Sequence, residues 1–130
     1  MAVALELGAR RTFATALAWP GWARAGRDEE GALDALLTAG PRYATVLRGT
    51  VPFRSPRSLD GLEVVERIPG DATTDFGAPG TPPSADADAV STRELARLTS
   101  ILRACWIAFD AAADAARGHA LRSGARHGDL

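Results

Sequence analysis

The stretch FATALAWPGWARAGRDEEGALDALL, residues 13–37, carries the signals that decide the fold. A strand-like run ends at Trp19, Pro20-Gly21 turns the chain, and Gly26 closes a short loop. Asp28 has the side chain of a favourable N-cap, and the two glutamates after it place negative charge at the positive end of the helix dipole. The stretch therefore predicts a strand, a loop over Pro20–Arg27 and a helix.

Three segments have the pattern of strands. Residues 3–7 alternate between large apolar side chains and small or charged ones, and Arg11–Trp19 follows as a second strand after a short link. Leu62–Ile68, with the sequence LEVVERI, is the third, stopped by a Pro-Gly pair. The helix after the loop is expected to break or kink at Gly40-Pro41, because proline cannot donate the backbone hydrogen bond.

The clearest helix begins at Ser91, which forms a capping box with Glu94. Apolar residues then recur at spacings of three and four as one stripe: Leu95, Leu98, Ile101, Leu102, Cys105, Phe109, Ala112 and Ala116. The prediction is an α+β protein, with a small antiparallel sheet (β-β-α-β) over residues 1–70 and one long amphipathic helix over residues 91–118. Residues 71–90, rich in Pro, Gly and Asp, form a linker, and residues 119–130 form a basic flexible tail.

Composition narrows the class of protein. The 130 residues are 46% hydrophobic and 24% charged, which is typical of a single globular domain. The net charge of −1 argues against nucleic-acid binding through bulk positive charge. The chain has no Lys, Asn or Gln, which indicates a GC-rich bacterial genome. Its start lacks the features of a signal peptide and no apolar run could span a bilayer, so a cytoplasmic location away from membranes is expected.

The first part of the chain resembles the N-terminal domain of HicB-type antitoxins. The residues that carry the resemblance follow one another in the family's order: Pro20-Gly21, Gly26, Asp28, Glu30 and Ala32-Leu33. The resemblance covers residues 3–48 and implies a non-catalytic interaction module that binds a protein partner. The family's DNA-binding C-terminal element has no counterpart in this sequence.

The whole chain also looks like a group of uncharacterised proteins from high-GC bacteria that continue into DinB-like helices. The matching phrases are PRYA, EVVERIPGDATTDFGAPG and ACWIAFDAA. DinB-like bundles hold a divalent metal with three histidines, whereas this chain has only His119 and His127, both in the tail. The alternative to an interaction module is therefore a fragment of such a metal-dependent bundle, or a truncated product without activity.

The binding residues expected for an interaction module surround the Pro20–Arg27 loop. Tryptophan and arginine are enriched in binding hot spots, and carboxylates at a helix start could face a basic partner. The candidates are Trp22, Arg24, Arg27, Asp28, Glu29 and Glu30. No cofactor and no catalytic residue is expected. A second possible interface is the 91–118 helix, which would form a homodimer if its apolar stripe is left uncovered.

Overall fold

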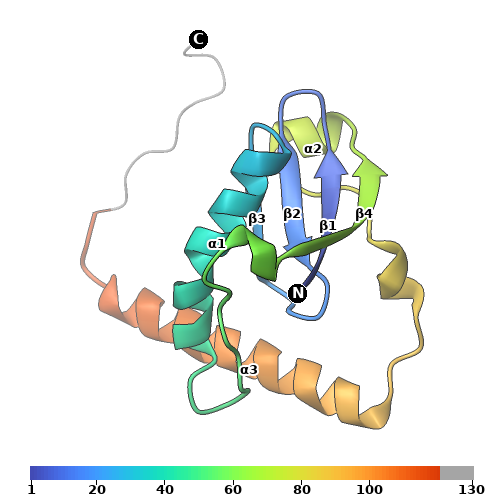
Figure 1. Ribbon diagram of the computed structural model, residues 1–130. Helices are drawn as coiled ribbons and strands as arrows, with labels where there is room; N and C mark the ends of the chain where they lie inside the picture. The colour runs from blue at the N-terminus through green and yellow to red at the C-terminus, as the bar shows by residue number, and fades with distance from the viewer. Residues whose placement is uncertain (121–130) are drawn as a thin grey trace.

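The computed structural model describes residues 1–120 and shows one four-stranded mixed sheet with helices around it (Figure 1). The strands are β1 (Ala2–Leu7), β2 (Thr12–Ala16), β3 (Ala23–Gly26) and β4 (Glu63–Pro69), in the order β3-β2-β1-β4. The helices are α1 (Glu29–Val46), α2 (Ala72–Phe76) and α3 (Thr92–Ala115), with short 3-10 turns η1 (Leu59–Gly61) and η2 (Ser84–Ala87). The predicted α+β class is confirmed, with one strand more than expected.

The sheet was predicted to be antiparallel, but it is mixed, antiparallel on one side and parallel on the other. β1 pairs antiparallel with β2, and β2 pairs antiparallel with β3. β1 also pairs in parallel with β4, so the chain must cross over between them, and α1 lies in that crossover. Parallel neighbours need such a connection, which places a helix on one face of the sheet.

The core lies between α1 and the first face of the sheet. Val3, Leu5, Ala14 and Ala16 present their side chains on this face and are all buried. Ala32 and Leu36 of α1 pack on them, together with the other buried members of the same cluster. Alanines at β2 let the helix lie close, because they leave little side chain between the two backbones.

Gly26 is required by this close approach. A Cβ atom at this position would lie 2.2 Å from the backbone nitrogen of Ala32, at the start of α1. The glycine ends β3, and Asp28 then caps α1 by accepting a hydrogen bond from the Gly31 N–H at 2.8 Å. The N-cap predicted from the sequence is confirmed.

The second face of the sheet is covered by residues 71–90, the segment predicted to be a linker. Glu6 points to this face and is only 4% exposed. Its carboxylate accepts hydrogen bonds from the Thr74 hydroxyl at 2.5 Å and from the backbone N–H groups of Gly80 and Thr81. A buried carboxylate needs such hydrogen-bond partners, so the hydrogen bonds of Glu6 hold residues 71–90 against the sheet.

Two local predictions are wrong in their extent. The strand expected over Arg11–Trp19 ends at Ala16, because the Trp19 N–H turns back to the carbonyl of Ala16. The loop expected over Pro20–Arg27 contains β3, whose residues pair with β2 from Thr15 opposite Ala23 onward. The segment is therefore a tight turn followed by an edge strand.

The helix α1 continues through Pro41 instead of breaking at Gly40-Pro41. Tertiary packing outweighs the missing backbone hydrogen bond, because Tyr43 and Leu47 beyond the proline are both buried. Gly40 is buried against Ser55, where a Cβ atom would lie 2.0 Å from the serine hydroxyl. The residues on either side of Pro41 thus hold the helix in place.

Candidate interaction surface

The N-terminal half of α3 is anchored to the rest of the protein. Ser91 caps the helix by accepting a hydrogen bond from the Glu94 N–H at 3.1 Å. Arg97 lies 4.8 Å over the Trp19 ring, and its guanidinium donates to the carbonyl of Ala18 and pairs with Glu94. Ile101 is 1% exposed inside the core. These contacts hold α3 across the lower end of α1 and the sheet (Figure 1).

Within residues 1–120, the C-terminal half of α3 has little protein around it. Among the residues from Trp106 onward only Ala108 is partly covered, and all described residues after it are exposed. Helix formation here rests on alanines, which have the highest helix propensity, because packing contributes little. The predicted helix is confirmed, but most of its apolar residues are not in a core.

Four large apolar side chains form a stripe on the open side of α3, which we call the α3 stripe: Leu95, Leu102, Trp106 and Phe109. Their exposed fractions are 58%, 58%, 58% and 64%. At about 100° per residue they fall within a sector of about 60° around the helix axis. Monomeric proteins rarely leave a large apolar patch uncovered, which makes the α3 stripe a candidate interaction surface.

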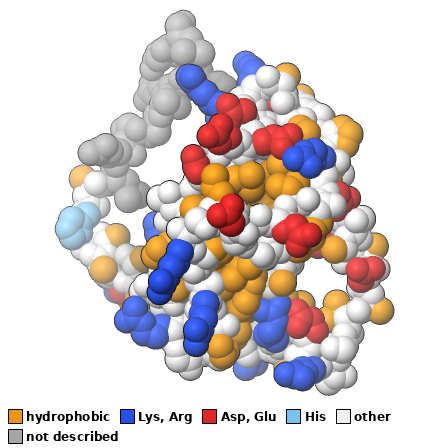
Figure 2. Space-filling view, in the orientation of Figure 1, with side chains coloured by type: hydrophobic (Ala, Val, Ile, Leu, Met, Phe, Trp, Pro, Cys, Tyr) orange, Lys and Arg blue, Asp and Glu red, His pale blue; other side chains and the backbone are white. Residues whose placement is uncertain are grey.

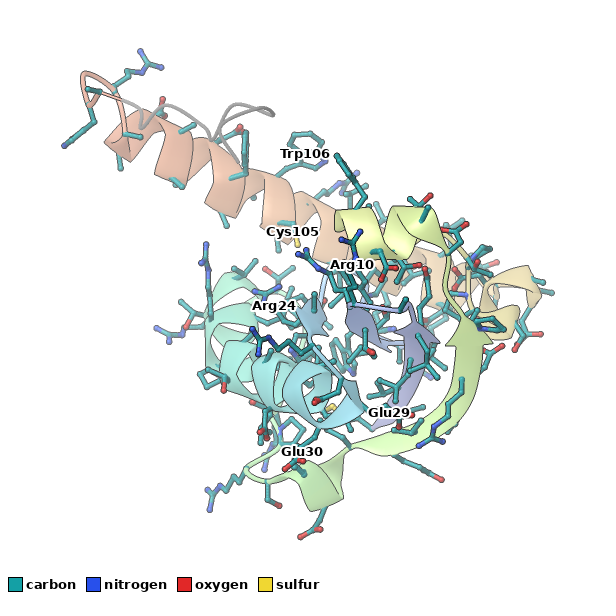
Figure 3. The ribbon with its side chains drawn as sticks, turned by 90° about the horizontal axis from the view of Figure 1, so that it is seen from above. Arg10, Arg24, Glu29, Glu30, Cys105 and Trp106 are labelled. Carbon is teal, nitrogen blue, oxygen red and sulfur yellow. The ribbon has the colours of Figure 1, made fainter. Side chains whose placement is uncertain are left out.

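The aromatic members of the α3 stripe are arranged against each other. The Trp106 and Phe109 rings meet edge to face, with centroids 6.2 Å apart and an interplanar angle of 86°. Figure 3 shows Trp106 on the outer side of α3, whereas Cys105 lies on the side that faces the body of the protein. The residue next to Trp106 is thus half-buried while the tryptophan is open to solvent.

A groove of about 340 Å³ runs beside the α3 stripe, between α3 and the C-terminal part of α1. Phe109 belongs to both the groove and the stripe, and Arg24 and Arg42 line the opposite wall. The floor includes Tyr43, whose hydroxyl donates a 2.8 Å hydrogen bond to the carbonyl of Pro20. Burial raises the pKa of Tyr43 to about 12.

The face seen in Figure 2 carries charges of both signs. More arginines lie in its lower part and more acidic side chains in its upper part, but both signs occur in both parts.

Trp22, expected at the binding loop, lies in the core. It is 1% exposed, its Nε1–H donates to the carbonyl of Leu36 at 2.9 Å, and its ring stacks on Tyr43 with centroids 6.0 Å apart. Phe53 meets both rings edge to face. The sequence around a tryptophan next to a Pro-Gly turn does not show whether its side chain lies on the surface of the loop or in the core. The burial of Trp22 depends on contacts with α1, which is distant from it in the local pattern.

The other predicted binding residues have mixed roles. Arg24, on β3, and Arg27 are exposed, and Arg24 lines the groove described above. Glu29 makes a two-pronged ion pair with Arg67 of β4, and the hydrogen bonds from this guanidinium hold the pKa of the carboxyl below its usual value. Glu30 is exposed and forms no ion pair within residues 1–120. Asp28, as the N-cap, already uses one carboxylate oxygen.

The weak metal candidates are not brought together by the described part of the structure. His119 is exposed beyond the end of α3, and His127 lies outside the described residues. Within residues 1–120 no group of three or more His, Cys, Asp or Glu side chains could hold a metal ion. The DinB-like alternative remains a prediction.

Sequence reasoning missed the structural role of Glu6. A glutamate in an alternating strand normally faces solvent, so the pattern of residues 3–7 gave no sign that another segment covers it.

Within residues 1–120 no helix is both long enough and apolar enough to cross a bilayer. Comparisons with family models, with curated proteins and with solved structures give no match to this chain.

Proposed function

We propose that this chain is a non-catalytic interaction module that binds another protein surface along α3. The observation that carries the proposal is the α3 stripe, whose four large apolar side chains are each more than half exposed. Covering such side chains contributes about 25 cal/mol for each Å² of apolar surface removed from water. The arrangement is that of a helix face that packs against a helix or an apolar groove.

The stripe also has the chemistry of a specific surface. A tryptophan and a phenylalanine in edge-to-face contact form a rigid aromatic centre, and tryptophan is among the residues that contribute most in interfaces. The aromatic centre follows directly after Ile101, which together with Arg97 holds the N-terminal half of α3 to the body. A rigid surface loses less conformational entropy on binding.

The test compares two sets of exposed side chains on the same helix. A dilute sample of the chain should enhance the fluorescence of 1-anilinonaphthalene-8-sulfonate, and replacing Leu102, Trp106 and Phe109 together by serine should abolish that enhancement. The matched control is Ile107→Ser, because Ile107 is 70% exposed but lies about 120° around the helix from the stripe. Equal dye fluorescence in the triple variant and the wild type, with unchanged helical circular dichroism, would contradict the proposal.

The HicB-like resemblance supports the same class of function through a different surface. Glu30 and Asp34 are exposed one turn apart at the start of α1, where carboxylates could face a basic partner. If this surface binds, Glu30→Arg should weaken binding of a basic protein partner in a titration. Glu29 is unsuitable for this test, because changing it also breaks its ion pair with Arg67. Binding unaffected by Glu30→Arg would remove the helix start from the interface.

A further inference from the structure

Two charges beside the α3 stripe are in no ion pair within residues 1–120. Arg103 and Asp110 are both exposed and lie on the same edge of the stripe, and neither is in an ion pair within residues 1–120. They are two helical turns apart, about 10.5 Å along the axis, so they cannot pair with each other in one helix. The other acidic residues of α3 near the stripe differ, because Glu94 pairs with Arg97 and Asp114 with Arg117, each at 2.7 Å.

We propose that the occupant of the α3 stripe is a second copy of this chain, paired antiparallel through α3 about a two-fold axis beside Trp106. This inference rests on the proposed function and names its partner. In an antiparallel pair, the same edges of the two stripes face each other. Arg103 of each copy then lies opposite Asp110 of the other, and the symmetry makes this contact twice.

The apolar residues fit the same arrangement. With the axis between residues 106 and 107, Leu102 of one copy faces the segment between Phe109 and Ala113 of the other. The two Trp106 rings meet at the axis. In a parallel pair, opposite edges of the two stripes face each other, so Arg103 and Asp110 of the two copies would not lie opposite one another. The positions of these charges therefore select the antiparallel pair.

The area of the stripe sets the expected strength of the pair. A buried aromatic side chain covers about 150–250 Å², so the exposed parts of Trp106 and Phe109 offer roughly 250 Å² per copy. Leu102 and the flanking side chains bring the pair close to about 1,000 Å² in total, the lower limit for a specific interface, whereas Leu95 lies opposite residue 118, beyond the end of α3, and adds little. We expect a reversible dimer whose population depends on protein concentration.

The experiment is a charge exchange measured by sedimentation velocity over a range of concentrations. Wild type should shift from monomer to dimer as the concentration rises. Arg103→Glu and Asp110→Arg should each weaken the dimer by about tenfold, since each places two like-charged pairs at the interface. The double variant should recover the wild-type dissociation constant. An equimolar mixture of the two single variants should form a mixed dimer, because opposite charges then face each other.

The remaining outcomes separate this inference from the proposed function. Trp106→Ser should abolish the dimer and Ile107→Ser should leave it unchanged. If the chain stays monomeric at every concentration but still binds the dye through the stripe, self-pairing is overturned and the proposed function stands. If it is monomeric and the stripe binds no dye, both are overturned. A dimer that ignores the charge exchange, with all variants folded by circular dichroism, would overturn the antiparallel pairing.

Discussion

Replacing Trp22 and Trp106 by alanine, one at a time, should change the free energy of unfolding by very different amounts, because one tryptophan lies in the core and the other on the open face. The two side chains are chemically identical, but Trp22 is 1% exposed and Trp106 is 58% exposed. Trp22→Ala removes the hydrogen bond to Leu36 and the ring contacts with Tyr43 and Phe53. A buried Trp→Ala change lowers the free energy of unfolding by about 3–5 kcal/mol, whereas an exposed site changes it by about 0.5 kcal/mol or less.

The assay is urea unfolding of dilute samples followed by far-ultraviolet circular dichroism, since each substitution removes a fluorophore. With a slope of about 1–3 kcal/mol per M urea, Trp22→Ala should lower the midpoint by more than about 1 M. Trp106→Ala should leave it nearly unchanged. The total stability of a domain is about 5–15 kcal/mol, so Trp22→Phe, which keeps an apolar ring, provides a milder variant that stays folded. Equal midpoint shifts for Trp22→Ala and Trp106→Ala would refute the placement of both residues.

Three further changes test the parts that support this surface. Thr74→Val leaves the buried Glu6 carboxylate one donor short and should cost about 1–3 kcal/mol of unfolding free energy; a loss below about 0.5 kcal/mol in urea unfolding would contradict the anchoring role. Gly26→Ala forces a backbone clash and should lower the thermal midpoint by several degrees, so an unchanged midpoint would show that α1 does not approach β3 so closely. Hydrogen bonds from Arg67 lower the pKa of Glu29, so the ion pair stabilises the folded protein above the unfolded-state pKa of this glutamate. This stabilisation is lost as the pH falls through its folded-state pKa. Glu29→Gln should therefore narrow the stability difference between neutral and acidic pH slightly, and an identical pH profile would exclude that ion pair in solution.

Local chemistry accounts for the parts of the fold that could be predicted. Asp28 and Ser91 both cap helices as expected, because the capping hydrogen bond involves residues only three apart. The strand predicted over Leu62–Ile68 is observed as Glu63–Pro69, since its β-branched residues are bounded by turn residues. Each of these signals needs no knowledge of the rest of the chain.

Features that depend on distant contacts could not be predicted. β3 has the sequence ARAG, which has no strand pattern, and it is a strand only because β2 supplies its hydrogen-bonding partner. The position of Trp22 depends on α1 in the same way. For α3 the period of the apolar residues was clear, but not which of them would be covered. Ile101 and Trp106 point about 140° apart around the helix axis, so Ile101 is buried against the body while Trp106 is exposed.

The parallel pairing of β1 with β4 has a consequence for the order in which this protein folds during synthesis. β1 can pair with β2 across a short turn as soon as residue 16 has left the ribosome, but its other edge waits for residues 63–69. Until then a strand edge with the apolar residues Val3 and Leu5 has no neighbour, and such edges recruit strands of other chains. The period in which the nascent chain can aggregate therefore ends only when β4 is made, and slower translation of the α1–β4 segment would lengthen it.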